Sequence, residues 1–262
     1  MTSQNIIPEK EVVIVVPVYR NLQDTEKASF DQLIKVLGHY PISILHPYSF
    51  NVDNLIENKS NLSEVGMNDN WFKGKMTYSA LCLNNDFYNN YIDYEYMLIY
   101  QLDAWVFRDE LHYWIAKGYD YVGAPWVPAD YILKRIIEYP WRQIRKLFPY
   151  NYYDIPQSIK HFSVGNGGFC LRRIPTMLDL IKDDTEIIKG IIKADIGEDL
   201  YISLVATKTH HLNIPDWRTA LAFSWERAMK HCYRLNHHQL PFGCHSWQVP
   251  KRYKWWKTYI QI

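Results

Sequence analysis

The stretch YMLIYQLDAWVF, residues 96–107, decides the fold of this chain. Its first five residues are apolar or aromatic without alternation, which is typical of a strand covered on both faces. The run ends at Gln101 and Asp103, whose side chains are expected to share one face because they are two residues apart. Ligands of open α/β sheets bind beyond the carboxyl ends of strands, so both are candidate site residues. Alternatively, Asp103 caps a helix or bonds to turn amides.

The residues before this stretch predict a βαβ unit. The β-branched run 12–17 indicates a buried first strand that ends at a proline. Apolar residues at helical spacing then predict a helix over 24–37, closed by Gly38. A second strand is predicted at 42–45, so the two strands are expected to be parallel.

The rest of the chain continues the alternation of helices and strands. We predict a loop over the sheet edge at 49–70, a helix at 76–91, a short helix at 110–117 and a strand at 119–122. The pattern favours one α/β domain with a mostly parallel central sheet flanked by helices.

The composition limits the partners and the location of the protein. The 262 residues carry 29 Lys and Arg against 28 Asp and Glu, which gives no general electrostatic reason to bind nucleic acid. Aromatic residues make up 16% of the chain, which suits either sugar stacking or a tyrosine-rich core. Four cysteines without a C-x-x-C pair, and the lack of a signal segment or membrane span, favour a cytoplasmic protein.

Two segments combine basic and aromatic or aliphatic residues. The first, 129–161, is predicted to be a basic helical insertion, and the second is the C-terminal run 251–257. Such faces can contact anionic lipids at the inner face of the plasma membrane or bind a lipid-linked acceptor. The alternative is a solvated charged helix face that packs on the domain.

A glycine-rich stretch and an acidic pair are further candidates for chemistry. Gly165, Gly167 and Gly168 would let the backbone approach a ligand closely, although a tight turn before a strand is the alternative. Glu198 and Asp199 lie at a predicted helix start, where one can cap the helix and the other can act as a general base. An acidic pair that only caps the helix is the competing interpretation.

The last part of the chain holds several histidines and two of the cysteines. A zinc site is conceivable, but the spacings match no familiar zinc pattern. Its ligands would come from His231, Cys232, His237, His238, Cys244 and His245. His245, in a loop with a glycine and aromatic residues, is better interpreted as one isolated ligand.

Taken in order, these motifs resemble those of bacterial GT-A glycosyltransferase-like proteins, in particular the DUF5672 family. The resemblance covers most of the chain and is carried by the first strand, 98–103, 123–126, 164–169, 198–199 and 241–245. It implies a GT-A-like, Rossmann-like fold and transfer of a sugar from a nucleotide-diphosphate sugar to a glycan or lipid-linked glycan of a bacterial polysaccharide or glycoconjugate.

The resemblance also implies a role for each matching residue. Asp103 resembles the last carboxylate of the DxD motif, and His245 resembles the late histidine that completes the site of Mn²⁺ or Mg²⁺. Gln101 replaces the first aspartate, which weakens the metal site or leaves an amide for the ribose. Asp199 resembles the base of inverting members, with Glu198 beside it. The remaining expected contacts are Pro17, Val18, Tyr19, Arg20, Leu102, Gly167 and Gly168 for the donor, and Trp126 and Asn166 for the acceptor.

Three alternatives stay open on the sequence. If Asp199 only caps a helix, a retaining course becomes possible. A nucleotidyltransferase would need a basic phosphate loop near the first strand, where only Arg20 is available. A carbohydrate-binding module would explain the aromatic residues without a nucleotide pocket.

Overall fold

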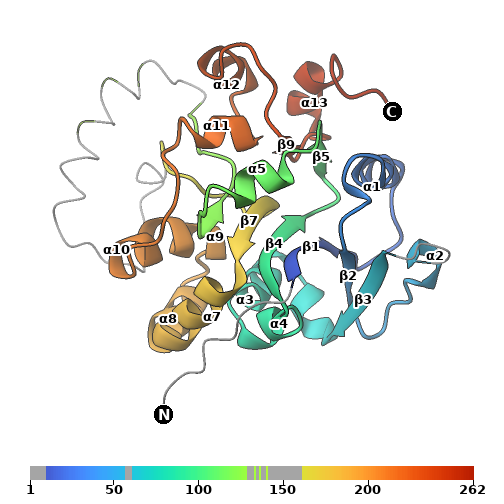
Figure 1. The fold of residues 1–262 in the computed structure, drawn as a ribbon, viewed down its shortest axis with the longest axis vertical. Helices are drawn as coiled ribbons and strands as arrows, with labels where there is room; N and C mark the ends of the chain where they lie inside the picture. Colours follow the sequence, from blue (N-terminus) through green and yellow to red (C-terminus); the bar gives the residue numbers. More distant parts are fainter. Residues whose placement is uncertain (1–9, 57–60, 129–132, 134–135, 137–139, 141–160) are drawn as a thin grey trace.

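A computed structural model describes residues 10–56, 61–128, 133, 136, 140 and 161–262. A six-stranded sheet crosses the molecule in the order β3-β2-β1-β4-β7-β6 (Figure 1). Strands β1, β2, β3 and β4 are parallel to one another, and β7 is antiparallel to both β4 and β6. The chain has the predicted α/β fold with a mostly parallel central sheet.

The predicted βαβ unit is confirmed. Strand β1 (Lys10–Pro17) is buried from residue 12 onward and pairs in parallel with β2 (Ile42–Pro47). Helix α1 (Asp24–Leu37) connects them, and its buried side chains keep the spacing that the sequence indicates. Gly38 caps the end of the helix, and its amide donates to the Ile34 carbonyl at 3.0 Å. A Cβ at position 38 would lie 2.1 Å from that oxygen, so a larger residue does not fit there.

Two predictions in the next segment are wrong. The predicted loop at 49–70 contains helix α2 (Asp53–Ile56) and the edge strand β3 (Leu62–Met67), which pairs with β2. The predicted helix at 76–91 is two helices, α3 (Lys75–Leu81) and α4 (Asn85–Asn89). Asn84 separates them, since its side chain accepts a hydrogen bond from the amide of Asp86 at 2.7 Å and so caps a new helix.

The central strand β4 (Tyr94–Tyr100) lies between β1 and β7 (Phe169–Arg173), as expected of a strand covered on both faces. The other elements of this part of the chain are η1 (Asp69–Phe72), α5 (Leu111–Ile115), β6 (Tyr121–Val122), α7 (Ile174–Asp183), α8 (Thr185–Lys193), α9 (Glu198–Leu200), the π-helical segment η3 (Tyr201–Ala206) and α10 (Thr207–Thr209). Helix α7 packs on β4, α4 and α8.

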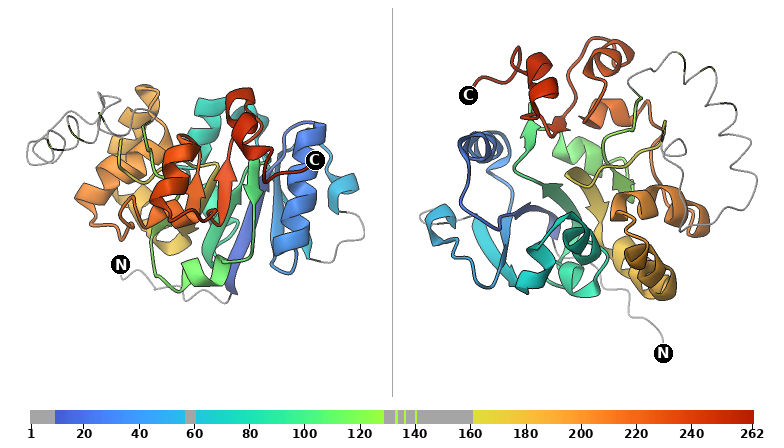
Figure 2. Two further views of the ribbon diagram at one scale, coloured as in Figure 1. Left: turned by 90° about the horizontal axis from the view of Figure 1, so that it is seen from above. Right: turned by 180° about the vertical axis from the view of Figure 1, so that it is seen from behind.

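A second sheet is made by segments far apart in the sequence. Strand β5 (Ala104–Val106) pairs with β9 (Gly243–His245), and β9 pairs with β8 (Ser224–Trp225). Helices α11 (Ala220–Phe223), α12 (Met229–Leu235) and α13 (Pro250–Trp256) surround this sheet. Seen from two further directions, α13 lies next to α1 (Figure 2). The second sheet therefore joins the C-terminal segment to the chain that leaves β4.

The predicted basic insertion at 129–161 lies outside the described residues, apart from Leu133, Ile136, Pro140 and His161. Within the described part of the chain, none of the helices has the length and apolar character needed to cross a membrane. All four cysteines are buried free thiols.

Candidate active site

A cleft of 470 Å³ opens where β1 and β4 end. Both strands run parallel, so their carboxyl ends meet at the same edge of the sheet. All the donor-site candidates from the first strand and from 101–103 line this cleft. Its lining residues are Pro17, Val18, Tyr19, Arg20, Leu22, Glu26, Phe72, Lys73, Gly74, Lys75, Tyr78, Gln101, Leu102, Asp103 and Gln248.

The expectation that Gln101 and Asp103 share one face of a strand needs correction. Strand β4 ends at Tyr100, and the amide of Ala104 bonds to the carbonyl of Gln101 at 2.8 Å across a turn. The two-residue alternation of a strand therefore stops before these residues, and Leu102 lines the cleft together with them.

Asp103 and His245 lie side by side although they are 142 positions apart in the sequence. Pairing of β5 with β9 places Ala104 opposite His245, and Asp103 Oδ1 lies 2.9 Å from His245 Nε2. The Ser246 hydroxyl donates to Asp103 Oδ2 at 3.1 Å. A strand follows Asp103 rather than a helix, so the interpretation of Asp103 as a helix cap is wrong.

The two side chains stabilise each other's charged forms. Burial alone would raise the pKa of Asp103, but His245 and Ser246 hold this pKa below its usual value. Burial alone would lower the pKa of His245, but the Asp103 carboxylate outweighs it and raises the pKa. Each charged form is therefore favoured by the charge of the other side chain.

The chemistry of this pair fits a divalent cation. His245 Nε2 is buried and makes no hydrogen bond of good geometry, although the carboxylate oxygen is close. Two ligands about 2.1 Å from one ion and at right angles to each other are about 3 Å apart. The described residues contain no group of three His, Cys, Asp or Glu side chains that could hold a metal, so diphosphate and water oxygens would have to complete the coordination.

The glycine stretch makes room for side chains on three sides. A Cβ on Gly165 would overlap the Trp126 ring, one on Gly167 would lie 2.1 Å from Glu198 Oε1, and one on Gly168 would lie 2.1 Å from His245 Nε2. The turn depends on Asn166, which has a φ of 68° and accepts a hydrogen bond from the Gly168 amide at 3.1 Å. Trp126 and Asn166 are 7% and 5% exposed, and their contact with an acceptor stays a prediction.

Glu198 and Asp199 have different surroundings. Glu198 is buried, accepts a hydrogen bond from Ser79 Oγ at 2.6 Å and pairs with Arg172 at 3.1 Å. Asp199 Oδ1 accepts a hydrogen bond from the amide of Leu200 at 2.8 Å. Burial and the neighbouring Glu198 charge raise the pKa of Asp199 to about 6. Glu198 is thus fixed by partners, whereas Asp199 is a carboxylate that can exchange a proton near neutrality.

Sequence reasoning missed two cations of the cleft. Lys73 and Lys75 line it, are exposed and have no ion pair within the described part of the chain. In contrast, Arg20 makes two hydrogen bonds to Glu26, at 2.7 and 2.9 Å. The signal was the Lys-Gly-Lys sequence after an aromatic pair, which falls between the predicted loop at 49–70 and the predicted helix at 76–91.

No role was predicted for Arg172 from the sequence. This arginine is fully buried in β7, and it donates to the Tyr88 hydroxyl at 3.0 Å as well as to Glu198. Its signal was a charged residue within an apolar strand. The zinc alternative finds no support, since no metal-binding cluster occurs among the residues that the structure describes.

The fold matches those of solved glycosyltransferases. The galactosyltransferase LgtC, crystallised with donor and acceptor sugar analogs, is 10% identical with a TM-score of 0.56, covering 95% of this chain and 97% of LgtC. Mouse xyloside xylosyltransferase 1 is 9% identical with a TM-score of 0.51, covering 90% of this chain and 97% of that protein. These similarities show a GT-A fold.

The bifunctional glycosyltransferase WbbM is 10% identical with a TM-score of 0.53, and the match covers 92% of this chain and 46% of WbbM. The chain therefore spans about half the length of WbbM. No curated protein matches the chain. A family model described as "Protein of unknown function (DUF5672)" matches residues 61–245, and the chain therefore belongs to the DUF5672 family.

Proposed function

We propose that this protein is a metal-dependent glycosyltransferase. It moves a sugar from a nucleotide-diphosphate sugar to a hydroxyl group of a bacterial glycan or lipid-linked glycan. One observation carries the proposal: Asp103 and His245 meet at 2.9 Å, with Asp103 lining a cleft at the carboxyl ends of β1 and β4. The GT-A fold supports it.

The cleft has the groups that a nucleoside diphosphate needs. Tyr19 is half exposed, and its ring lies 6.5 Å from that of Phe72, which offers an aromatic surface to the nucleoside. Arg20 and Glu26 neutralise each other, so Lys73 and Lys75 outweigh the single charge of Asp103. A diphosphate would neutralise this excess positive charge. Gln101 offers an amide to the ribose.

Asp103 and His245 would hold the cation, Mn²⁺ or Mg²⁺. When bound, the cation supplies positive charge to the leaving diphosphate. Lys73 and Lys75 supply further positive charge from the protein itself. Gly168 keeps the space beside His245 Nε2 open, because any side chain there would occupy it.

Asp199 is the proposed base for the acceptor hydroxyl, which gives inversion at the anomeric carbon. Its raised pKa places proton uptake near neutral pH. The charge of Lys75 lowers this pKa against the effects of burial and Glu198, and Lys75 also lines the cleft. The proposed base and the donor site are therefore electrostatically linked through one lysine.

The test measures donor hydrolysis and sugar transfer over a panel of nucleotide sugars with Mn²⁺. We expect wild-type activity with at least one donor and a loss of about 1,000-fold in Asp103→Ala. Asp31→Ala is the matched control, because Asp31 is exposed on α1 and its side chain makes no ion pair with the described residues. Equal activity of wild type and Asp103→Ala would contradict the metal role.

Calorimetry separates this function from the alternatives. A glycosyltransferase is expected to bind a nucleoside diphosphate in a Mn²⁺-dependent manner. A carbohydrate-binding module would bind glycans without the nucleotide. A nucleotidyltransferase would release pyrophosphate from a nucleoside triphosphate, which a phosphate assay coupled to a pyrophosphatase detects.

A further inference from the structure

The charges of the chain are divided unequally along its length. After Glu226 the sequence has no Asp or Glu, whereas residues 227–262 contain seven Lys and Arg. The preceding 226 residues carry 22 Lys and Arg against 28 Asp and Glu. The net charge near +1 thus hides an acidic main part and a basic C-terminal segment, a pattern that indicates an anionic partner.

The fold gathers these cations on two helices that pack together. Helices α12 and α13 lie side by side at one end of the molecule (Figures 1 and 2). Tyr233 of α12 contacts Trp255 of α13, with ring centroids 5.9 Å apart, and Tyr259 just after α13, with centroids 6.3 Å apart. Trp256 is fully buried beneath this contact. The aromatic rings therefore hold the two basic helices in one unit.

Five of the seven cations are available to a partner. Glu226 pairs with Arg227 at 3.5 Å and with Arg252 at 3.2 Å. The other five are exposed and form no ion pair with the described residues: Lys230, Arg234, Lys251, Lys254 and Lys257. We call these five residues the basic patch.

The spacing of the basic patch places its residues in pairs on the helix faces. Lys230 and Arg234 are four residues apart on α12, and Lys251 and Lys254 are three apart on α13, so each pair shares one helix face. Trp256 is buried on the opposite side of α13 from the lysines. Val249, 39% exposed, and Tyr259, 37% exposed, flank the lysines of α13.

We propose that the basic patch docks this protein on an anionic lipid bilayer. Exposed cations next to half-exposed aromatic and aliphatic groups suit the headgroup region, where charge attracts and apolar groups enter. The donor cleft lies close by, since its residue Gln248 is two residues before the first residue of α13. Docking would thus hold the cleft near the bilayer surface. The inference does not depend on the proposed function.

The test measures binding of the full chain to vesicles of phosphatidylcholine alone or with 30% phosphatidylserine. Binding is expected only with phosphatidylserine and should weaken as salt is raised from 50 to 300 mM. The triple variant Lys251→Gln, Lys254→Gln, Lys257→Gln should bind about 100-fold more weakly, from about fivefold per charge.

The matched control removes three exposed lysines that form no ion pair with the described residues elsewhere, through Lys35→Gln, Lys182→Gln and Lys193→Gln. It should keep binding within about twofold. Equal loss in both variants, or binding that ignores phosphatidylserine, would overturn the proposal. Tighter binding to heparin or a short oligonucleotide than to the vesicles would also overturn it, because the patch would then serve a soluble polyanion.

Discussion

Asp103 and Asp199 are the same residue type in environments that shift their pKa values in opposite directions. Burial alone would raise the pKa of Asp103, but His245 and Ser246 hold it below its usual value. Burial and the Glu198 charge raise the pKa of Asp199 to about 6. A carboxylate that stays ionised suits cation binding, and one that titrates near neutrality suits proton transfer. Neighbouring groups thus give two aspartates different pKa values, which suit them to different roles.

The two regions are also held in place differently. Asp103 is positioned by strand pairing, because β5 and β9 bring His245 beside it. The Asp199 region is positioned by the ion pair of Arg172 and Glu198, whose side chains are 0% and 10% exposed. Removing a charged side chain should therefore destabilise the fold more in the Asp199 region than in the Asp103 region.

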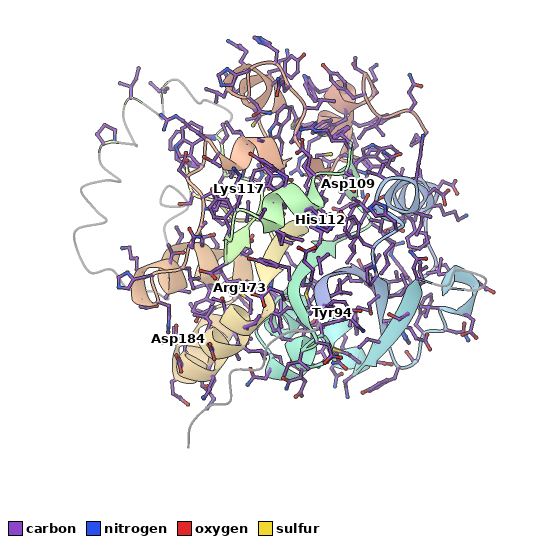
Figure 3. The ribbon with its side chains drawn as sticks, in the orientation of Figure 1. Tyr94, Asp109, His112, Lys117, Arg173 and Asp184 are labelled. Carbon is purple, nitrogen blue, oxygen red and sulfur yellow. The ribbon has the colours of Figure 1, made fainter. Side chains whose placement is uncertain are left out.

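Arg172→Met breaks this buried pair and has the largest expected effect. It leaves the Glu198 carboxylate buried without its cation, which should lower the free energy of unfolding by about 3–5 kcal/mol. Urea denaturation measures the loss. Arg173→Met is the matched control: Arg173, labelled in Figure 3, is the next residue of β7, and its side chain is 44% exposed in a pair with Glu95. Its loss should stay below about 1 kcal/mol.

A double variant sharpens this prediction. Arg172→Met with Glu198→Gln removes both charges, so the variant should regain part of the stability lost by Arg172→Met alone. If the double variant is as unstable as the single one, packing rather than charge explains the loss.

Asp199→Asn tests the proposed base. The variant keeps the side-chain oxygen that accepts from the Leu200 amide but cannot take up a proton, so transfer should fall about 100-fold. Wild-type transfer should fall as pH drops through about 6, where Asp199 becomes protonated. This acid limb should disappear in the variant, while affinity for nucleoside diphosphate changes little. If the acid limb is unchanged in the variant, another group transfers the proton. A retaining mechanism would then become possible again.

The same substitution should stabilise the fold at alkaline pH. The pKa of Asp199 rises from 3.8 to about 6, so the native state takes up a proton between these values and loses stability as pH rises through them. Asp199→Asn removes this cost, and its partly exposed side chain limits the gain to about 1–2 kcal/mol at pH 8.

The gain should vanish near pH 4, where Asp199 is protonated in the native state. Denaturation at pH 4 and pH 8 provides the measurement. Asp183→Asn, at the exposed end of α7, should change stability by less than about 0.5 kcal/mol at both pH values. A gain that is equal at pH 4 and pH 8 would show that charge is not its cause.

Strong local patterns explain which parts of the fold were predictable. Strands β1 and β4 are long apolar runs, and α1 has regular helical spacing with a glycine stop. Edge strand β3 was missed because it includes the exposed residues Ser63 and Glu64 and lacks an apolar run. The break between α3 and α4 depends on one local cap at Asn84, which the apolar pattern does not reveal.

The candidate site was less predictable because it depends on long-range contacts. The proximity of Asp103 and His245 was expected from family resemblance alone, since local patterns do not predict the pairing of β5 with β9. The ion pair of Arg172 with Glu198 likewise joins two distant segments. Lys73 was missed because exposed lysines are common and carry no periodic signal.

Gly168→Ala tests whether the space beside His245 is needed for cation binding by Asp103 and His245. The added Cβ would lie 2.1 Å from His245 Nε2, so the imidazole must move away from Asp103. We expect Mn²⁺ affinity, measured by calorimetry with a nucleoside diphosphate, to fall about tenfold, as for changes that displace a metal ligand's support. Gly74→Ala is the matched control in the same cleft, because its Cβ would meet no atom within 4 Å among the described residues. Equal affinity in both variants would mean that His245 does not contribute to cation binding, and Asp103 would then act without it.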